Sequence, residues 1–454
     1  MLPVFKSIFP YNQELIAEYS LLNDSEVQKR IDNASEAFRS WKNKSFAQRA
    51  DILMKVARLM RRDQEKLATL ITREMGKVLS ESRAEIEKCA WVCDYYAENG
   101  AGFLKDEKRE AGYNKSFVSY EPLGVVLAIM PWNFPFWQVF RFAAPTLMAG
   151  NVGLLKHAPN VCGCSLAIEK LFLEAGAGAG VMSSLVIDVP VMEKIISSGI
   201  VQAVTLTGSE KAGSSVAALA GKHIRKSVLE LGGSDALIVL ADADLQKAAA
   251  TAVQSRMQNA GQSCIAAKRF IVVRSAEDSF LQEISTEIKK LRQGNPLESG
   301  ISTGPVARPD LAANIQRQMQ ESVKKGAQLL FGGEAKGCNV VPSLLTGVQR
   351  GMPAFDEETF GPMAVVISAK DDEDAVRLAN DSSFGLGGSI WTRDIEKGIA
   401  LAKKMESGAV FINTLVKSDP RLPFGGIKQS GYGRELGVEG MREFVNIKAI
   451  AAQT

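Results

Sequence analysis

The chain has 454 residues, of which 46% are hydrophobic and 23% are charged, a composition typical of a globular protein. Its length predicts two large domains, because a single hydrophobic core rarely grows to this size. The 54 basic and 51 acidic residues give a net charge of +3 without a long run of one sign. This balance argues against nucleic acid or a membrane surface as a partner and favours a small-molecule substrate.

The six cysteines and two histidines exclude some chemistry and indicate a compartment. Six cysteines in so long a chain do not make a disulfide framework, which favours a reducing compartment. His157 and His223 do not stand at the spacing of a zinc site, so no metal is expected. The first residues lack the apolar core of a secretory signal, and the longest apolar run, residues 123–130, is too short to span a bilayer. We therefore expect a cytoplasmic protein.

The first hundred residues are predicted to be mainly helical. Apolar side chains recur at steps of three and four residues from residue 25 to 41, which is the period of an amphipathic helix. A Ser-Phe-Ala-Gln capping box at residues 45–48 predicts the start of a second helix with the same period.

The period then changes to short apolar runs separated by helix-compatible stretches such as residues 165–175. Strands that alternate with helices predict parallel sheets covered on both faces, so the fold class is α/β with two such domains. Gly-rich joins at 232–233 and 424–426 are candidate boundaries. The first series of strands is predicted at 124–130, 152–155, 203–206, 227–231 and 236–240. The second series has strands at 270–273, 363–367, 388–391 and 409–412, with helices at 280–291, 373–380 and 395–405.

One cysteine and one glutamate stand in contexts that suit covalent catalysis. Cys264 follows the turn Asn-Ala-Gly-Gln-Ser, and Glu230 lies 34 residues earlier in Leu-Glu-Leu-Gly-Gly. A thiolate is a soft nucleophile, and a separate carboxylate can act as the base that activates water. A lone cysteine is more often a small buried hydrophobic residue, so the prediction of a nucleophile depends on the motifs that accompany it.

The segment Pro-Trp-Asn-Phe-Pro, residues 131–135, follows a predicted strand. Its two prolines fix the loop, so that Asn133 could donate to an oxyanion at the carboxyl end of that strand. The simpler interpretation is a rigid turn with Trp132 packed in the core.

Two other segments contain groups that suit a dinucleotide, although neither is specific by itself. Lys156 and a Thr-Gly-Ser turn end two strands, and Gly208 and Gly213 leave backbone N–H groups free for phosphate oxygens, unless the turn merely caps a helix. Glu358 could accept hydrogen bonds from ribose hydroxyls and Phe360 could pack beside a nicotinamide. Otherwise the two are a solvated acid and a core aromatic.

Seven segments in this order resemble the NAD(P)-dependent aldehyde dehydrogenase superfamily, from about residue 25 to the C-terminus. They are Pro-Trp-Asn-Phe-Pro, the strand-ending Lys156, Thr-Gly-Ser, Glu-Leu-Gly-Gly, Gly-Gln-Ser-Cys, Glu-Glu-Thr-Phe-Gly-Pro and Pro-Phe-Gly-Gly-Ile-Lys-Gln-Ser-Gly. Within this superfamily the chain looks most like the succinate-semialdehyde dehydrogenases, particularly the shorter bacterial form. The resemblance implies two Rossmann-like α/β domains and a β-ribbon for oligomerisation.

The resemblance also implies a mechanism. Cys264 would attack the aldehyde carbon, while the Asn133 side chain and the Cys264 backbone N–H hold the oxyanion. Hydride transfer to the nicotinamide would leave a thioester, which water activated by Glu230 hydrolyses. Because an unperturbed cysteine is mostly a thiol at neutral pH, the site should lower its pKa or deprotonate it through Glu230 or water.

In such relatives the dinucleotide lies across several of these motifs. The contacts implied here are Met130, Pro131, Trp132, Asn133, Lys156, His157, Ala158, Pro159, Gly208, Ser209, Leu231, Gly232, Glu358 and Phe360. Members that strictly use NAD often carry a glutamate three residues after the ribose-binding lysine, where it repels a 2′-phosphate. Because this chain has Pro159 there, we expect it to use both NAD and NADP.

Four residues are candidates for contact with the substrate. Arg141 lies eight residues after Asn133, where succinate-semialdehyde dehydrogenases carry an arginine for the substrate carboxylate; the alternative is a surface or interface ion pair. Gln258 stands where the mammalian type has a second arginine. Ser418 and Arg421 belong to a loop that borders the substrate tunnel in relatives.

The implied domains are 1–105 with 123–232 for NAD(P) binding, 233–432 for catalysis, and 106–122 with 433–454 for oligomerisation. The ribbon would pair residues 111–121 with 443–451. Because relatives assemble as dimers or dimers of dimers, a homodimer or homotetramer is expected.

Three other functions are open alternatives. A dehydrogenase of broad specificity would act on medium-chain or aromatic aldehydes. A CoA-acylating enzyme is disfavoured by Glu230, since a thioester awaiting CoA should not have a hydrolytic base beside it. A non-catalytic protein that keeps the fold is disfavoured because Cys264, Glu230 and Asn133 occur together.

Overall fold

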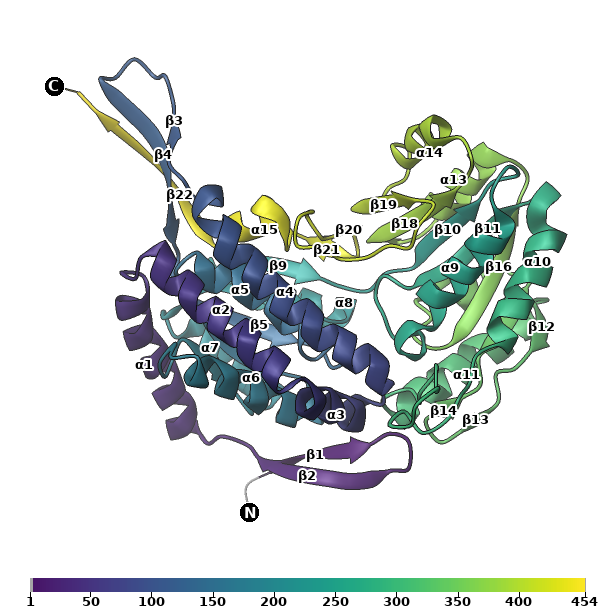
Figure 1. The fold of residues 1–454 in the computed structure, drawn as a ribbon, viewed down its shortest axis with the longest axis horizontal. Coiled ribbons are helices and arrows are strands. Elements are labelled where there is room, and N and C mark those ends of the chain that lie inside the picture. The colour runs from purple at the N-terminus through teal and green to yellow at the C-terminus, as the bar shows by residue number, and fades with distance from the viewer. Residues whose placement is uncertain (1–2, 454) are drawn as a thin grey trace.

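A computed structural model describes residues 3–453, so Met1, Leu2 and Thr454, at the ends of the predicted domains, lie outside the described residues. Two α/β lobes are joined side by side, and a narrow arm extends from the first lobe (Figure 1). Each lobe is built around its own mainly parallel sheet, on which helices pack. The α/β class with two sheets, predicted from the sequence, is confirmed.

The chain begins with an antiparallel hairpin that the sequence analysis missed. β1 (Val4–Phe9) pairs with β2 (Glu14–Ser20), and most of their side chains are not buried, so the apolar alternation of a strand is weak. The Ser7 hydroxyl anchors the hairpin by donating to the buried Glu74 carboxylate at 2.9 Å. Helices follow as predicted, and the capping box of Ser45 and Gln48 begins the second. They are α1 (Asp24–Trp41), α2 (Phe46–Arg62), α3 (Gln64–Met75) and α4 (Leu79–Phe103).

The first lobe contains a six-stranded sheet in the order β21-β9-β8-β5-β6-β7. The parallel strands are β5 (Val125–Met130), β6 (Val152–His157), β7 (Met182–Ser184), β8 (Val201–Thr207) and β9 (Lys226–Glu230), and β21 (Gly431–Tyr432) runs antiparallel at the edge. The connecting elements are α5 (Trp137–Met148), η1 (Pro159–Val161), α6 (Cys162–Glu174), η2 (Val189–Val191), α7 (Met192–Ser197) and α8 (Glu210–Lys222). The carboxyl ends of the parallel strands meet at one edge, where open α/β folds bind ligands.

The second lobe contains a seven-stranded sheet in the order β12-β15-β16-β11-β10-β18-β19. β10 (Asp235–Val239) pairs with β11 and β18, so the run at 236–240, which the sequence analysis grouped with the first series, belongs to the second sheet. The other strands are β11 (Ala267–Val273), β12 (Gln328–Phe331), β15 (Ser343–Thr346), β16 (Met363–Ala369), β18 (Gly387–Trp391) and β19 (Ala409–Ile412).

The helices predicted in the second lobe are present, and others were not foreseen. α10 (Arg274–Lys289), α13 (Asp372–Asn380) and α14 (Ile395–Ala402) match the prediction within a few residues. The unforeseen elements are the sheet strands β12 and β15, together with α9 (Leu245–Met257), α11 (Pro309–Lys324), α12 (Pro353–Asp356), β13 (Ala335–Lys336), β14 (Asn339–Val340), β17 (Phe384–Gly385) and β20 (Ile427–Lys428).

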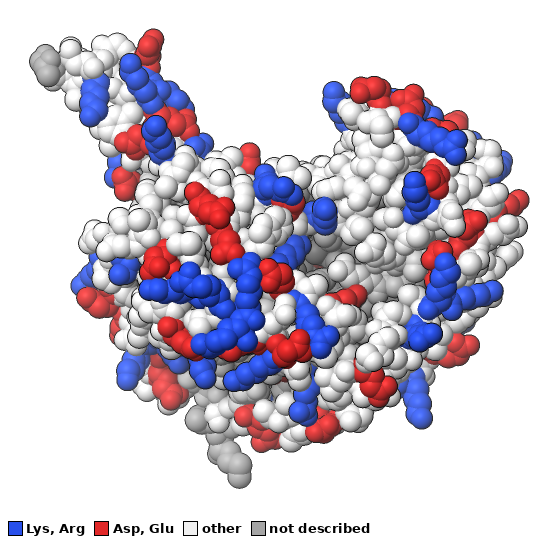
Figure 2. Space-filling view, in the orientation of Figure 1, with Lys and Arg blue, Asp and Glu red and all other residues white. Residues whose placement is uncertain are grey.

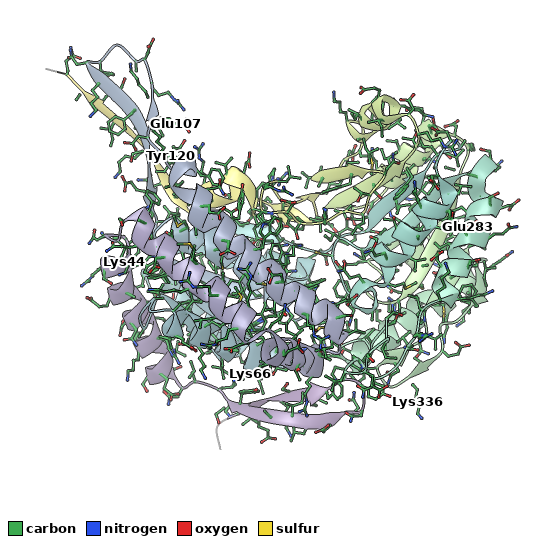
Figure 3. The ribbon with its side chains drawn as sticks, viewed as in Figure 1. Lys44, Lys66, Glu107, Tyr120, Glu283 and Lys336 are labelled. Atoms are coloured by element: carbon green, nitrogen blue, oxygen red, sulfur yellow. The ribbon has the colours of Figure 1, made fainter. Side chains whose placement is uncertain are left out.

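The arm is a three-stranded antiparallel sheet in the order β22-β4-β3, made of β3 (Glu107–Lys108), β4 (Lys115–Pro122) and β22 (Val445–Ala452). The short helix α15 (Gly437–Arg442) leads into β22. The predicted pairing of the two segments is confirmed, with Tyr120 opposite Ile447. At the base of the arm the Tyr120 hydroxyl donates to Glu107 at 2.6 Å (Figure 3).

The visible face carries Lys and Arg interspersed with Asp and Glu, and it is hollowed between the two lobes (Figure 2). Within residues 3–453 no helix is long and apolar enough to cross a membrane. The same residues contain no cluster of three or more side chains suited to hold a metal ion.

Candidate active site

A cleft of about 670 Å³ lies between the lobes, at the carboxyl edge of the first sheet. The Trp132 ring meets the edge of Phe360 there, with ring centroids 5.8 Å apart. Cys264 and many of the predicted cofactor contacts therefore share one cleft. The predicted site residues that line it are Pro131, Trp132, Asn133, Gly208, Ser209, Leu231, Gly232, Cys264, Glu358 and Phe360.

Cys264 follows a tight left-handed turn, η3 (Gln258–Gly261). Asn259 and Ala260 have φ of 54° and 51°, a conformation that is strained for residues with a side chain. Glu81 of α4 holds this turn, because its two carboxylate oxygens accept the Asn259 backbone N–H at 3.0 and 3.2 Å. Helix α4 of the first lobe therefore fixes the backbone just before Cys264.

Asn133 is locked against the same loop. Its Nδ2 donates to the Gln262 carbonyl at 3.1 Å, and Asn259 Nδ2 donates to the Asn133 carbonyl at 2.8 Å. The Asn133 side chain is 4% exposed, and both it and Cys264 line the cleft. An amide N–H held in this way can stabilise an oxyanion formed at the sulfur, since it need not reorganise.

The Cys264 thiol is not activated by its surroundings. Burial raises its pKa to about 11, although the positive charges of Arg141 and Lys268 act in the opposite direction. The expectation that the site lowers this pKa is therefore wrong, because desolvation outweighs the two cations. The remaining route is proton transfer to a base or to water as the substrate binds.

Glu230 ends β9 and is 2% exposed, and among residues 3–453 neither of its carboxylate oxygens has a hydrogen-bond partner. Burial, and then the nearby Glu435 carboxylate, raise the pKa of Glu230 well above its usual value, which favours the protonated carboxyl group. Gly425 leaves room for this side chain, since a Cβ there would lie 2.7 Å from Glu230 Oε1. A buried carboxyl group with unpaired oxygens suits proton transfer with water.

Arg141 has an internal partner that the sequence analysis did not foresee. Its guanidinium forms a buried ion pair with Glu435, stacks over the Phe424 ring at 4.4 Å and donates to Thr207 Oγ1 at 3.4 Å. The side chain is 1% exposed. The sequence analysis predicted either a substrate contact or a surface ion pair for Arg141, and not a buried ion pair. Binding of a substrate carboxylate by Arg141 would require its pair with Glu435 to open.

The other candidate substrate residues lie in different surroundings. Ser418 is buried, and its hydroxyl accepts from Trp137 Nε1 at 2.9 Å and from Lys88 Nζ at 2.8 Å. Arg421 is exposed and binds Asp419 at 2.6 and 2.8 Å, so it has a carboxylate partner already. Gln258 is exposed at the start of η3.

The buried Lys268 side chain connects Glu358 to the loop that contains Cys264. Lys268 Nζ lies 3.2 Å from Glu358 Oε1 and donates to the Ser263 and Cys264 carbonyls, each at 2.7 Å. Glu358 also accepts the Gly233 N–H at 3.1 Å. It is therefore an oriented carboxylate at the cleft rather than a freely solvated acid.

The predicted cofactor residues at the ends of β5 and β6 have different surroundings. The His157 ring contacts main-chain groups of three residues. Its Nδ1 accepts the Ala158 N–H and lies 3.2 Å from the Met130 carbonyl, and its Nε2 lies 2.8 Å from the Pro135 carbonyl. Burial lowers the pKa of His157 to about 4, so the neutral ring braces these loops. Lys156 is 8% exposed and forms no ion pair with any residue in the range 3–453.

The Thr-Gly-Ser turn at the end of β8 uses the amides that were expected to be free. The Gly208 N–H donates to the Glu230 carbonyl at 3.0 Å and the Gly213 N–H to the Ser209 carbonyl at 2.9 Å, so that expectation is wrong. The Ser209 side chain caps α8 by accepting the Ala212 N–H at 3.4 Å. The first turn of α8 still offers backbone N–H groups and the positive end of the helix dipole to an anion in the cleft.

These residues fit a dinucleotide. A glycine is needed at position 232, because a Cβ on Gly232 would collide with the carboxylates of Glu210 and Glu358. The helix start, the unpaired Lys156 and the oriented Glu358 offer donors to phosphate and acceptors to ribose. Pro159, from which the use of both cofactors was predicted, is exposed at the start of η1.

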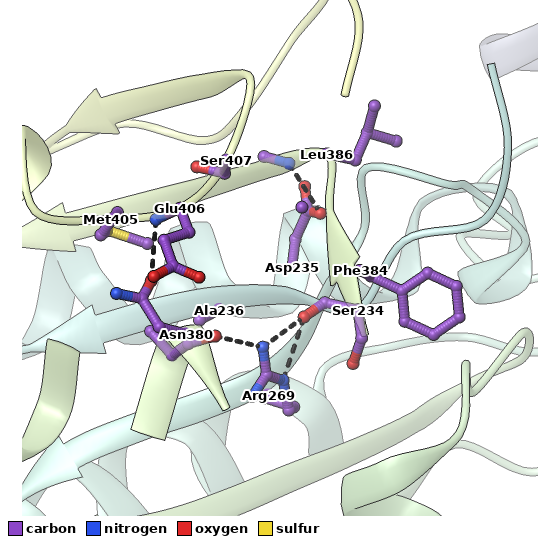
Figure 4. A pocket seen from close by; sticks show the side chains of 13 residues that line it. Ser234, Asp235, Ala236, Arg269, Asn380, Phe384, Leu386, Met405, Glu406 and Ser407 are labelled. Atoms are coloured by element: carbon purple, nitrogen blue, oxygen red, sulfur yellow. Dashed lines mark hydrogen bonds between the residues drawn. The ribbon is translucent and has the colours of Figure 1, made fainter. Parts of the chain in front are cut away.

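A second, smaller cavity lies beside Ser234 and Asp235 at the start of β10 (Figure 4). Asp235 and Arg269 border it, and the Arg269 guanidinium donates to the Ser234 carbonyl at 2.8 Å. Asp235 accepts the Gly387 N–H at 3.0 Å, and burial raises its pKa to about 7. A volume of about 10 Å³ admits one water but no organic substrate.

Comparison with known proteins identifies the family. The model of the aldehyde dehydrogenase family matches residues 3–450. The chain belongs to the aldehyde dehydrogenase family. It is 47% identical to a probable succinate-semialdehyde dehydrogenase (NADP+) from Synechocystis sp. over 447 residues, which cover 98% of both proteins. It is 42% identical to the succinate semialdehyde dehydrogenase (NAD(P)+) Sad from Escherichia coli, over 98% of this chain and 97% of that protein.

Solved structures of the family superpose on the whole chain. A crystal structure of succinic semialdehyde dehydrogenase from Streptococcus pyogenes, in complex with NADP+ as the cofactor, is 36% identical with a TM-score of 0.97. It covers 99% of this chain and 100% of that one.

Sequence reasoning missed several residues that build the site of this aldehyde dehydrogenase. Glu81, Lys88, Lys268 and Glu435 act through partners that are remote in the chain, and only three-dimensional contacts reveal them. The one local signal was Lys268, shortly after Cys264 and two residues before the strand predicted at 270–273. A charged residue at a buried strand position calls for a partner.

Proposed function

We propose that this aldehyde dehydrogenase oxidises succinate semialdehyde to succinate with NADP or NAD. The observation that carries this proposal is the shared cleft, in which Cys264, Asn133 and the oriented Glu358 lie together beside the end of β9. The whole-length similarity to enzymes named for this substrate and for NADP supports it.

In the proposed mechanism the Cys264 sulfur adds to the aldehyde carbon, and the Asn133 side chain with the Cys264 backbone N–H holds the oxyanion. The bound nicotinamide supplies the hydride acceptor. The resulting thioester is hydrolysed when Glu230, as the carboxylate, takes a proton from water and the hydroxide adds to the acyl carbon. Collapse of that adduct expels the sulfur and releases the carboxylic acid.

Binding of the cofactor is proposed for the cleft side of the first sheet. Lys156 would donate to the adenosine ribose, the start of α8 would face the pyrophosphate, and Glu358 would accept from the nicotinamide ribose. Pro159 leaves room for a 2′-phosphate and does not repel it, so both dinucleotides should be used.

The deciding experiment is a kinetic panel in which succinate semialdehyde, hexanal and benzaldehyde are each measured with NAD and NADP. We expect kcat/KM for succinate semialdehyde to exceed the other values by at least about tenfold, the effect of one good charged contact. Equal values would favour the dehydrogenase of broad specificity. A requirement for CoA would favour the acylating enzyme, and the absence of NADH or NADPH with every aldehyde would favour a non-catalytic protein.

We further propose that the arm joins subunits into a homodimer or a homotetramer in the cytoplasm. β22 is an edge strand with exposed apolar side chains, and an open edge of this kind favours pairing with another chain. The six cysteines are free, which agrees with a reducing compartment.

A further inference from the structure

Glu210 is a carboxylate inside the cleft that the proposed mechanism leaves unused. It lies in the first turn of α8, and its side chain lines the cleft together with Glu358. Glu210 as a whole is partly exposed, but its Oε1 atom is buried and forms no hydrogen bond with residues 3–453. A buried carboxylate oxygen without a donor is unfavourable, so this position calls for a physical explanation.

Glu210 faces a second carboxylate across the Gly232 backbone. A Cβ on Gly232 would collide with Glu210 Oε1 and with Glu358 Oε2. Because each oxygen lies within 2.6 Å of that one point, the two oxygens are no more than about 5 Å apart. Two negative charges at this spacing repel each other, and Lys268, whose Nζ lies 3.2 Å from Glu358 Oε1, offsets part of the repulsion.

The surroundings of Glu210 act on its charge in both directions. Burial raises the pKa of the carboxyl group, and the Glu358 carboxylate adds to this effect. The backbone N–H groups of Glu210 itself and of Gly232, and the charge of Lys268, lower the pKa without cancelling the increase. The carboxylate therefore lies beside backbone donors at the start of α8, and it takes up a proton more readily than an ordinary glutamate.

The start of α8 is also where the proposed function places the pyrophosphate of the cofactor. An anion at this position gains from the backbone N–H groups and from the helix dipole. Glu210 already draws on the same donors, and its negative charge repels a second anion. A glutamate that only stabilised the helix could do so from the solvent side, whereas this one lies in the cleft.

We propose that the Glu210 carboxylate competes with the pyrophosphate of the cofactor for the N–H groups at the start of α8, and thereby weakens cofactor binding as pH rises. This inference rests on the proposed function, because it requires a dinucleotide in this cleft. Protonated Glu210 carries no charge and does not repel the pyrophosphate, whereas ionised Glu210 does. By linkage, the dinucleotide should bind together with a proton, and an alkaline solution should favour its release.

The test measures the Kd for NADH by protein fluorescence from pH 5 to 8. NADH serves as the probe because it lacks a 2′-phosphate, which would itself change protonation in this range. Glu210→Gln removes the charge and keeps the shape, so it should lower Kd about tenfold at pH 8 and progressively less toward pH 5. Glu210→Asp keeps the charge and should stay within about threefold of the wild type.

Two further variants serve as controls for this comparison. Glu396→Gln is the matched control, since Glu396 also lies in the first turn of a helix, α14, but is exposed and is not among the residues that line the cleft. It should leave Kd unchanged at every pH. Glu358→Gln should raise Kd, because Glu358 is proposed to accept hydrogen bonds from the nicotinamide ribose.

Calorimetry provides a second measurement that needs no turnover. Titration with NADH at pH 7 in PIPES and in Tris, which differ in enthalpy of ionisation, gives the number of protons taken up on binding. The wild type should take up more protons than Glu210→Gln, while Glu396→Gln should match the wild type.

The outcomes separate this inference from the proposed function. A wild-type enzyme that binds neither NADH nor NADPH would contradict both. If the wild type binds NADH and Glu210→Gln has the same Kd and the same proton uptake, the competition is refuted and the proposed function stands. Weaker binding by Glu210→Gln would also refute the competition, and it would make Glu210 a hydrogen-bond acceptor for the cofactor.

Discussion

The two groups that carry the proposed chemistry both have raised pKa values. In the resting enzyme burial favours the Cys264 thiol and the Glu230 carboxyl group, whereas the reaction needs a thiolate and then a carboxylate. Each group must therefore lose its proton in turn as the reaction proceeds.

Alkylation tests the resting state of Cys264. With a pKa of about 11, roughly one thiol in a thousand is ionised at pH 8. The second-order rate of alkylation of the free enzyme by iodoacetamide should rise about tenfold per pH unit from pH 7 to 10, since the thiol loses its proton as pH rises. Peptide mapping with Cys264→Ala as the control assigns the signal, and a plateau below pH 8 would refute the raised pKa.

Replacement of the two groups should separate the two halves of the reaction. Cys264→Ala should abolish turnover while fluorescence titration shows unchanged binding of NADPH. Glu230→Gln should slow thioester hydrolysis by about 10²–10⁴-fold and leave a burst of reduced cofactor equal to the enzyme concentration. In the wild type hydrolysis should accelerate with rising pH, because Glu230 must lose a proton whose pKa is raised. The absence of a burst in Glu230→Gln would contradict its role in the second half.

Pro159 is expected to control the choice of cofactor. Pro159→Glu should raise KM for NADP at least about tenfold, through repulsion of the 2′-phosphate, with little change for NAD. Pro159→Gln separates charge from shape and should leave both KM values close to the wild type. Equal KM changes for the two cofactors in Pro159→Glu would place the 2′-phosphate elsewhere.

Site residues were predicted where a short sequence motif contains them, and they were missed where their role depends on a partner that is distant in the chain. Cys264, Asn133 and Glu358 were found because short motifs present them at strand ends, and the structure brings them to one cleft. The pairing of Arg141 with Glu435 could not be predicted, because it joins two segments nearly 300 residues apart whose approach depends on the whole lobe.

At the scale of elements, the turn before the nucleophile depends on a helix that is far away in the chain. η3 holds Asn259 and Ala260 in a strained conformation, and the Glu81 carboxylate of α4 compensates by accepting the Asn259 N–H. A single interaction thus links the geometry of the loop to the position of α4.

Glu81 should make the stability of this loop depend on pH. Burial raises the pKa of Glu81 to about 7, so the folded protein holds a proton that the unfolded chain releases above about pH 4.5. Stability from this group is present at low pH and is lost as pH rises from about 4.5 to 7. Relative to wild type, Glu81→Gln should therefore gain about 2.5 kcal/mol in free energy of unfolding between pH 5 and 8, measured by urea denaturation. Glu65→Gln, at the exposed Arg83 pair, is the control, and a constant difference from wild type across this pH range would contradict the raised pKa.

The predicted elements differ in how well periodicity revealed them. Most longer strands buried on both faces and several helices with one apolar stripe were recognised, since burial imposes a clear pattern, although α11 and β15 were missed. The hairpin β1–β2 and the short strands β13 and β14 were not, because exposed or very short strands carry little pattern. The placement of β10 required knowledge of pairing, which a parallel sheet does not encode locally.

At the scale of the molecule, the arm is the exposed sheet through which we expect subunits to assemble. Ile447 and Ile450 of β22 are 62% and 36% exposed, an unusual position for isoleucine on a protruding strand. The double change Ile447→Asp and Ile450→Asp should convert the oligomer to a monomer in size-exclusion chromatography with light scattering. Ile395→Asp on α14, where the side chain is 48% exposed, should leave the mass unchanged. A double variant with the mass of the wild type would place the interface elsewhere.

Glu81 and Glu85 lie one turn apart on one side of α4. Glu81 accepts the Asn259 N–H in the turn before Cys264, and Glu85 accepts the Phe136 and Trp137 N–H groups just after the loop of Asn133. One rigid helix therefore sets the spacing between the loop that carries the sulfur and the loop that carries the amide. A substitution that tilts α4 would misalign both groups together without touching either of them.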